Sequence, residues 1–123
     1  MSRVLIVEDE VELCRMLADQ IRNIGLDVDA VFNAEDGIKN YQESDYWLVL
    51  TDIRLPGMDG VQMMGKMKIE KPDKQTTFFV MSGFSDYSLN EIKDKGAHDF
   101  FEKPGDLSRL VGSIKSLPMF PLA

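Results

Sequence analysis

The chain has 123 residues, of which 44% are apolar and 28% are charged, and 14 basic against 21 acidic side chains give it a formal net charge of -7. This length allows one domain with a buried core and excludes a second domain of ordinary size, and the composition is not that of a disordered or fibrous protein. Because the basic residues are scattered and outnumbered, direct binding of this chain to nucleic acid is not expected.

The single cysteine, Cys14, cannot form an internal disulfide and has no second cysteine with which to share a metal ion. This favours a reducing compartment, so we expect a cytoplasmic protein in which Cys14 is a small apolar side chain on a helix face. The first residues lack the pattern of a secretory signal. No stretch approaches the roughly 18 apolar residues that a membrane span needs, so no membrane association is expected.

Short apolar runs alternate with helical patterns along the whole chain. Residues 4–7 are continuous and rich in β-branched side chains, as in a strand that is buried on both faces. Apolar residues at three- and four-residue steps then predict a helix over 11–24, which Gly25 ends. Continued in this way, the sequence predicts strands at 4–7, 27–32, 47–52, 76–82 and 98–101, and helices at 11–24, 34–41, 61–69, 86–95 and 107–117.

Five strands that alternate with five helices indicate an α/β fold with one parallel sheet, right-handed crossovers and helices on both faces. The apolar stripe of residues 86–95 is poor, so we expect a marginal helix there. Residues 1–117 are predicted to form the domain, and 118–123 a short C-terminal tail.

Several polar residues stand where the predicted strands end. Glu8 and Asp9 follow the first strand, Asp52 ends the third, Ser82 ends the fourth, and Lys103 comes after the fifth. Ligands of open parallel sheets bind at the carboxyl ends of the strands. We therefore expect a site at this edge of the sheet.

The residue types at this edge indicate phosphoryl chemistry. Three carboxylates would repel one another without a cation, and their oxygen ligands suit Mg²⁺, or Mn²⁺ in its place. Lys103 could pair with a phosphoryl oxygen and Ser82 could donate a hydrogen bond to another, with Asp52 as the nucleophile. Each residue alone has an ordinary interpretation as a turn former, helix cap or surface lysine. Their coincidence at one edge favours function.

Four motifs contain these residues and follow one another along the chain in this order: VLIVEDE, VLTDIRLPGMDG, FVMSGFSD and GAHDFFEKP. With them, residues 3 to 117 closely resemble the receiver domain of two-component response regulators. The resemblance implies a flavodoxin-like fold with the sheet order 2-1-3-4-5.

The resemblance also implies roles for individual residues. Asp52 would accept a phosphoryl group from the phosphohistidine of a sensor histidine kinase, or from a small phosphodonor, and Ser82 and Lys103 would bind that group. The implied ligands of Mg²⁺ are Glu8, Asp9, Asp52 and the main-chain carbonyl of Arg54. Self-phosphorylation and self-dephosphorylation would be the only chemistry, so the chain is not expected to be an enzyme.

A switch follows from the same resemblance. Ser82 would move toward the phosphoryl group and Phe100 would turn inward, while Arg54 and Phe84 would tune the lifetime of the phosphoryl group. The face formed by the fourth helix, fifth strand and fifth helix would then be read by a downstream protein or output domain, and it is a candidate homodimer interface. The Lys103–Pro104 peptide bond is expected to be cis.

Four other functions are alternatives to this one. A phosphorelay intermediate would pass its phosphoryl group to a histidine phosphotransfer domain. A phosphatase of the haloacid-dehalogenase type would have a second aspartate where this chain has Arg54. A nucleotide-binding module would have a glycine-rich loop after the first strand, where this chain has EDE. A degenerate receiver that only docks to partners would lack site residues that are present here.

Overall fold

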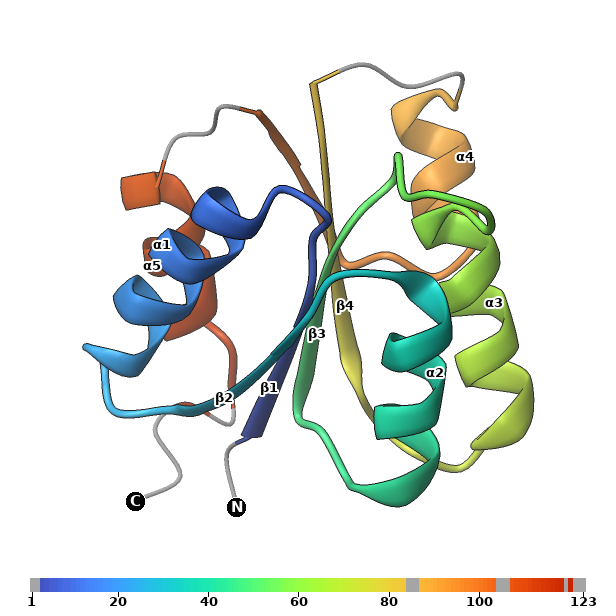
Figure 1. The fold of residues 1–123 in the computed structure, drawn as a ribbon, viewed down its shortest axis with the longest axis horizontal. Coiled ribbons are helices and arrows are strands. Elements are labelled where there is room, and N and C mark those ends of the chain that lie inside the picture. Colours follow the sequence, from blue (N-terminus) through green and yellow to red (C-terminus); the bar gives the residue numbers. More distant parts are fainter. Residues whose placement is uncertain (1–2, 84–86, 104–106, 119, 121–123) are drawn as a thin grey trace.

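The computed structural model describes residues 3–83, 87–103, 107–118 and 120, and within them strands and helices alternate regularly (Figure 1). The strands are β1 (Arg3–Val7), β2 (Asp27–Val31), β3 (Leu48–Asp52), β4 (Thr77–Ser82) and β5 (Asp99–Glu102). The helices are α1 (Val11–Arg22), α2 (Ala34–Glu43), α3 (Gly60–Glu70), α4 (Leu89–Asp94) and α5 (Leu107–Lys115). The strands pair in parallel in the order β2-β1-β3-β4-β5. The predicted fold class and sheet order are confirmed.

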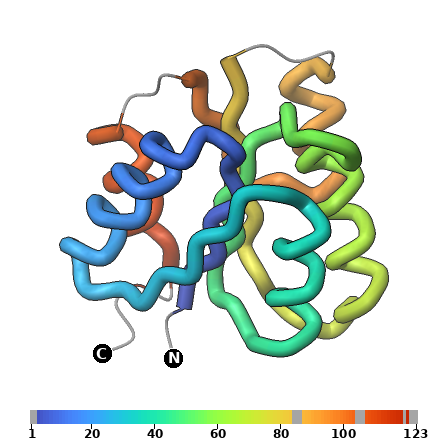
Figure 2. The backbone as a smooth tube through the Cα atoms, viewed as in Figure 1, coloured from blue at the N-terminus to red at the C-terminus, as the bar shows by residue number. Residues whose placement is uncertain are grey.

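Helices cover both faces of the sheet: α1 and α5 lie on one side, and α2, α3 and α4 on the other (Figure 1). Helices α1 and α5 are neighbours although they come from opposite ends of the sequence (Figure 2). Successive side chains of a strand point to opposite faces, so Val4 and Ile6 enter the core under α1 and α5, while Leu5 and Val7 enter the other core. This two-sided burial explains the continuous apolar runs of the sequence.

The largest difference from the predicted elements concerns α4, which begins at Leu89 and has Ile92 as its buried residue. Ser88 caps it, because its hydroxyl accepts a hydrogen bond from the main-chain N–H of Glu91 while the Glu91 side chain bonds back to Ser88. Residues 84–86 lie outside the described part. Within the described residues, no helix has both the length and the apolar character needed to cross a membrane.

The loop between β3 and α3 fixes the end of β3. Gly57 has a φ of 76°, which a type II turn requires at its third position, and Asp59 caps α3 in a reciprocal pair with Gln62. The main-chain N–H of Gly60 donates to Ile53 O (2.8 Å), and a Cβ at Gly60 would overlap the main-chain oxygen of Asp52. The close approach therefore requires glycine and holds the end of β3 against the start of α3.

Candidate functional site

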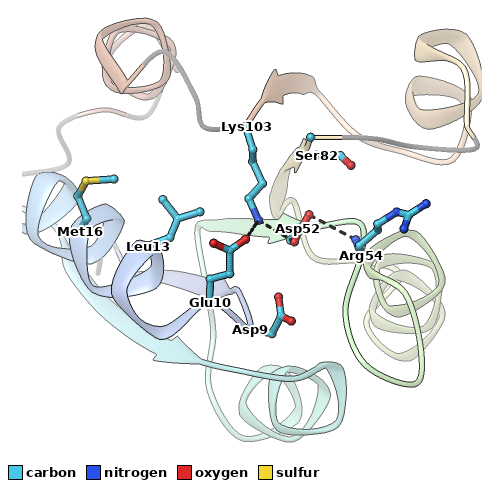
Figure 3. A pocket seen from close by; sticks show the side chains of 9 residues that line it. Asp9, Glu10, Leu13, Met16, Asp52, Arg54, Ser82 and Lys103 are labelled. Carbon is cyan, nitrogen blue, oxygen red and sulfur yellow. Dashed lines mark hydrogen bonds and ion pairs between the residues drawn. The ribbon is translucent and has the colours of Figure 1, made fainter.

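The residues expected at the strand ends lie together at the carboxyl edge of the sheet. A cavity of about 620 Å³ opens there, lined by Asp9, Glu10, Leu13, Met16, Asp52, Arg54, Ser82, Gly83 and Lys103 (Figure 3). Glu8 is fully buried, and its main-chain N–H donates to Val31 O (3.1 Å), which fixes it beside β2. The main-chain N–H of Lys103 donates to Ser82 O (3.2 Å), so those two side chains start from neighbouring points.

Three carboxylates form an acidic cluster, which consists of Glu8, Asp9 and Asp52. One oxygen from each lies within 4.8 Å of the others. Glu8 and Asp52 are buried, whereas Asp9 is exposed. Burial raises the pKa of Glu8 to about 7, although its contact with Lys103 opposes this effect. Burial also raises the pKa of Asp52, again against the effect of Lys103.

Lys103 brings one positive charge to the acidic cluster. Its Nζ lies 2.9 Å from Glu8 Oε1 and 3.0 Å from Asp52 Oδ2, and a third carboxylate oxygen, Glu10 Oε1, is also 3.0 Å away. Burial lowers the pKa of Lys103, but its contacts with the three carboxylates outweigh this and raise the pKa above its usual value. Lys103 therefore remains charged at neutral pH.

The acidic cluster has the properties of a site for a hard divalent cation. Glu8 Oε1 is one of two buried side-chain atoms, with Arg3 Nε, that lack a hydrogen-bond partner within the described part of the chain. Its contact with Lys103 is an ion pair without hydrogen-bond geometry. A buried oxygen of this kind, with other carboxylate oxygens close by, fits Mg²⁺, which prefers oxygen ligands.

The other predicted residues occupy three different settings. Ser82 is buried at the end of β4 and faces the cavity. Arg54 is exposed, and its main-chain N–H donates to Asp52 Oδ1 (3.3 Å). Phe100 lies in β5, where it is half-buried against the core under α2, α3 and α4. Phe84 and the Lys103–Pro104 bond lie outside the described residues.

Glu10 is not among the residues predicted for the site, yet its carboxylate accepts a hydrogen bond from Lys103 Nζ. The available signal was the third acidic residue in the run EDE. A hydrogen bond that was not predicted runs from the Tyr87 hydroxyl to Asp59 Oδ2 (3.0 Å) and connects the segment before α4 to the cap of α3.

Comparisons with known proteins agree with one another. The family model for the response regulator receiver domain matches residues 4–115. Response regulator ArlR of Staphylococcus aureus is 29% identical over 118 residues, which cover 95% of this chain and 52% of ArlR, so this chain spans about half the length of such relatives.

Solved structures show the same fold. A two-component response regulator from Clostridium difficile superposes with a TM-score of 0.85 at 22% identity, covering 94% of this chain and 93% of that one. Response regulator TrrA from Thermotoga maritima, in complex with Mg²⁺-BeF, superposes with a TM-score of 0.82 at 25% identity, covering 94% of this chain and 97% of that one.

Proposed function

We propose that this chain, which belongs to the response regulator receiver domain family of two-component systems, accepts a phosphoryl group on Asp52. The observation that carries the proposal is the setting of this carboxylate. Asp52 is buried at the end of β3, shares the acidic cluster with Glu8 and Asp9, and accepts a hydrogen bond from Lys103 Nζ at 3.0 Å. The family implies a sensor histidine kinase as the partner that supplies the phosphoryl group.

In the proposed transfer, an oxygen of the Asp52 carboxylate forms a bond to phosphorus while the phosphorus–nitrogen bond of the donor phosphohistidine breaks. The electron pair leaves on the imidazole nitrogen, which then takes up a proton. The Lys103 ammonium offsets negative charge on the phosphoryl oxygens, and the Ser82 hydroxyl donates a hydrogen bond to one of them.

Receiver domains bind Mg²⁺ at an acidic pocket, and we propose that the acidic cluster is the Mg²⁺ site of this chain. The proposed ligands are Glu8, Asp9, Asp52 and the main-chain carbonyl of Arg54, and Mn²⁺ could replace Mg²⁺. When bound, the ion supplies positive charge that draws phosphoryl oxygens to the site. The Mg²⁺-BeF complex of TrrA supports this assignment.

Phosphorylation replaces one negative charge at Asp52 by about two. We propose that Ser82 and Phe100 respond, that Arg54 and Phe84 tune the lifetime of the phosphoryl group, and that the α4-β5-α5 face changes. Helix α4 suits this role, because it has six residues and buries only Ile92, whereas α1 has twelve and buries four. Amide hydrogen exchange should therefore be faster in α4 than in α1, and equal protection would contradict a marginal α4.

The α4-β5-α5 face is the proposed contact with a downstream protein, an output domain or a second copy of the chain. An output domain is consistent with relatives of about twice this length. We assign residues 1–117 to the receiver domain and 118–123 to its tail. Receiver domains are generally not true enzymes, and Mg²⁺-dependent self-phosphorylation and self-dephosphorylation are the proposed limit. A phosphorelay role would use the same Asp52 chemistry, and no contact within the described residues favours it.

Beryllofluoride, a phosphoryl analogue, tests this proposal. With Mg²⁺ and beryllofluoride, we expect backbone NMR shifts at Ser82 and Phe100 in the wild type and in Asp73→Asn, a control for loss of an exposed aspartate. Asp52→Asn should show none of them. An unresponsive wild type, or the same response in Asp52→Asn, would overturn the proposal.

A further inference from the structure

Lys103 is held by a carboxylate that does not belong to the acidic cluster. Glu10 Oε1 accepts a hydrogen bond from Lys103 Nζ at 3.0 Å, across 93 positions of sequence. In Figure 3 the ammonium lies between Glu10 and Asp52, and dashed lines join it to both. The contact connects the loop after β1 with the residue after β5 above the proposed phosphoryl acceptor.

The Glu10 side chain forms a hydrogen bond with Lys103 and does not cap helix α1. Glu10 occupies the N-cap position of α1, yet its side chain makes no capping hydrogen bond to any described residue. The main-chain N–H of Glu10 donates to Glu8 Oε2 (2.9 Å), and this hydrogen bond fixes the backbone from which the Glu10 side chain extends. Because the side chain of Glu10 is 65% exposed and that of Lys103 only 13%, the pair adds little to stability but restricts where the ammonium can go.

We propose that Glu10 is a positioning residue that holds the Lys103 ammonium away from an incoming phosphoryl group and so slows phosphorylation of Asp52. This inference rests on the function proposed above. Lys103 Nζ donates hydrogen bonds to Asp52 and Glu10 and also forms an ion pair with Glu8. A phosphoryl oxygen must therefore compete with these carboxylates for the one ammonium, and the negative charge of Glu10 also repels it.

The test compares Glu10→Gln with Glu12→Gln, which removes the same charge from an exposed position in the first turn of α1. Phosphorylation by acetyl phosphate is followed at a Mg²⁺ concentration that saturates each variant. We expect Glu10→Gln to react about five-fold faster than wild type, the effect of one solvent-screened unit charge near contact distance, and Glu12→Gln to react as wild type. The difference should shrink at high ionic strength, because Glu10 is exposed.

A second measurement needs neither metal nor phosphodonor. The side-chain ammonium signal of Lys103 in a ¹H–¹⁵N NMR spectrum of the metal-free protein should shift in Glu10→Gln and stay unchanged in Glu12→Gln. The proposal is overturned if that signal is the same in wild type and Glu10→Gln, or if Glu10→Gln fails to react faster than Glu12→Gln. A wild type that accepts no phosphoryl group would instead refute the proposed function, and the Lys103 signal would still decide whether Glu10 holds the ammonium.

Discussion

The two edges of the sheet both bury polar side chains, and at the amino edge these side chains satisfy one another. The Tyr41 hydroxyl donates to Thr76 Oγ1 (2.9 Å), and the Thr76 hydroxyl donates to the main-chain oxygen of Tyr46 (3.0 Å). The Tyr46 hydroxyl donates in turn to Asp29 Oδ2 (2.7 Å). Each hydroxyl in this series has a partner, so the series can stabilise the fold without any ligand.

At the carboxyl edge, by contrast, several carboxylates share one ammonium. Lys103 contacts Glu8, Glu10 and Asp52, and Glu8 Oε1 still lacks a hydrogen bond from any residue that the structure describes. Buried charges that outnumber their partners lower stability. The hydroxyls of the amino edge therefore stabilise the fold by themselves, whereas the carboxyl edge carries the excess negative charge that the proposed cation would offset.

The largest expected effect comes from removing the ammonium. Lys103→Met leaves the buried Glu8 and Asp52 without a positive charge, so the free energy of unfolding in EDTA at pH 8 should fall by about 3 kcal/mol. Mg²⁺ should restore part of this loss. Denaturant titrations with and without Mg²⁺ measure both effects, with Lys93→Met on the exposed face of α4 as the control. If Lys103→Met were as stable as the Lys93→Met control, the buried carboxylates of the carboxyl edge would not depend on Lys103 for compensation of their charge.

A smaller loss is expected at the amino edge. Thr76→Val keeps the shape but leaves the buried Tyr41 hydroxyl and the Tyr46 carbonyl without their shared partner, which should cost about 2 kcal/mol. Phosphorylation by acetyl phosphate should be unchanged. Thr77→Val, at the next and only half-buried position, is the matched control. If Thr76→Val altered the phosphorylation rate and spared stability, the division between the edges would be wrong.

Glu8 makes stability depend on pH at the carboxyl edge. Its pKa is raised from 4.5 to about 7 in the folded protein, so the folded state binds the proton more tightly. The contribution of the protonated Glu8 side chain to the free energy of unfolding is fully present below pH 4.5 and is lost as the pH rises through about 7. In EDTA, the wild type should therefore lose stability over this range relative to Glu8→Gln, as measured by denaturant midpoints. If the denaturant midpoints of the wild type and Glu8→Gln changed equally with pH, this expectation would be wrong.

The smallest expected effect has the opposite sign and belongs to the amino edge. His98 precedes β5, and burial together with the charge of Lys68 lowers its pKa from 6.5. Its contribution to stability is present above pH 6.5 and is lost as the pH falls below that value. On acidification, the wild type should lose slightly more stability than His98→Gln, as measured by thermal unfolding of both proteins at the same series of pH values. The reverse order would show that His98 gains a partner on protonation.

The core strands could be predicted from sequence because a strand buried on both faces must be almost wholly apolar. Element ends were less certain: α1 stops at Arg22, two residues before the predicted end. The late start of α4 was readable in principle, since Ser88 and Glu91 have the spacing of a capping box. The apolar stripe of residues 86–95 is too weak to indicate where the helix begins.

The membership of the acidic cluster could be anticipated because parallel strands end at one edge, so residues distant in sequence meet there. The choice of Glu10 as a partner of Lys103 could not be anticipated, because it depends on the direction in which the side chain of this N-cap residue turns. The hydrogen bonds among Tyr41, Thr76 and Tyr46 could not be anticipated either, since they join residues 35 and 30 positions apart in the sequence.

The central claim is that Asp52 forms an acyl phosphate, and chemical mapping tests it most directly. After reaction with acetyl phosphate and Mg²⁺, borohydride reduction converts an aspartyl phosphate to homoserine, which peptide mass spectrometry locates. The account predicts homoserine at position 52 in wild type, dependence on Mg²⁺, and no such product at Asp9 or Asp59. An unmodified position 52, or modification at another aspartate, would contradict it.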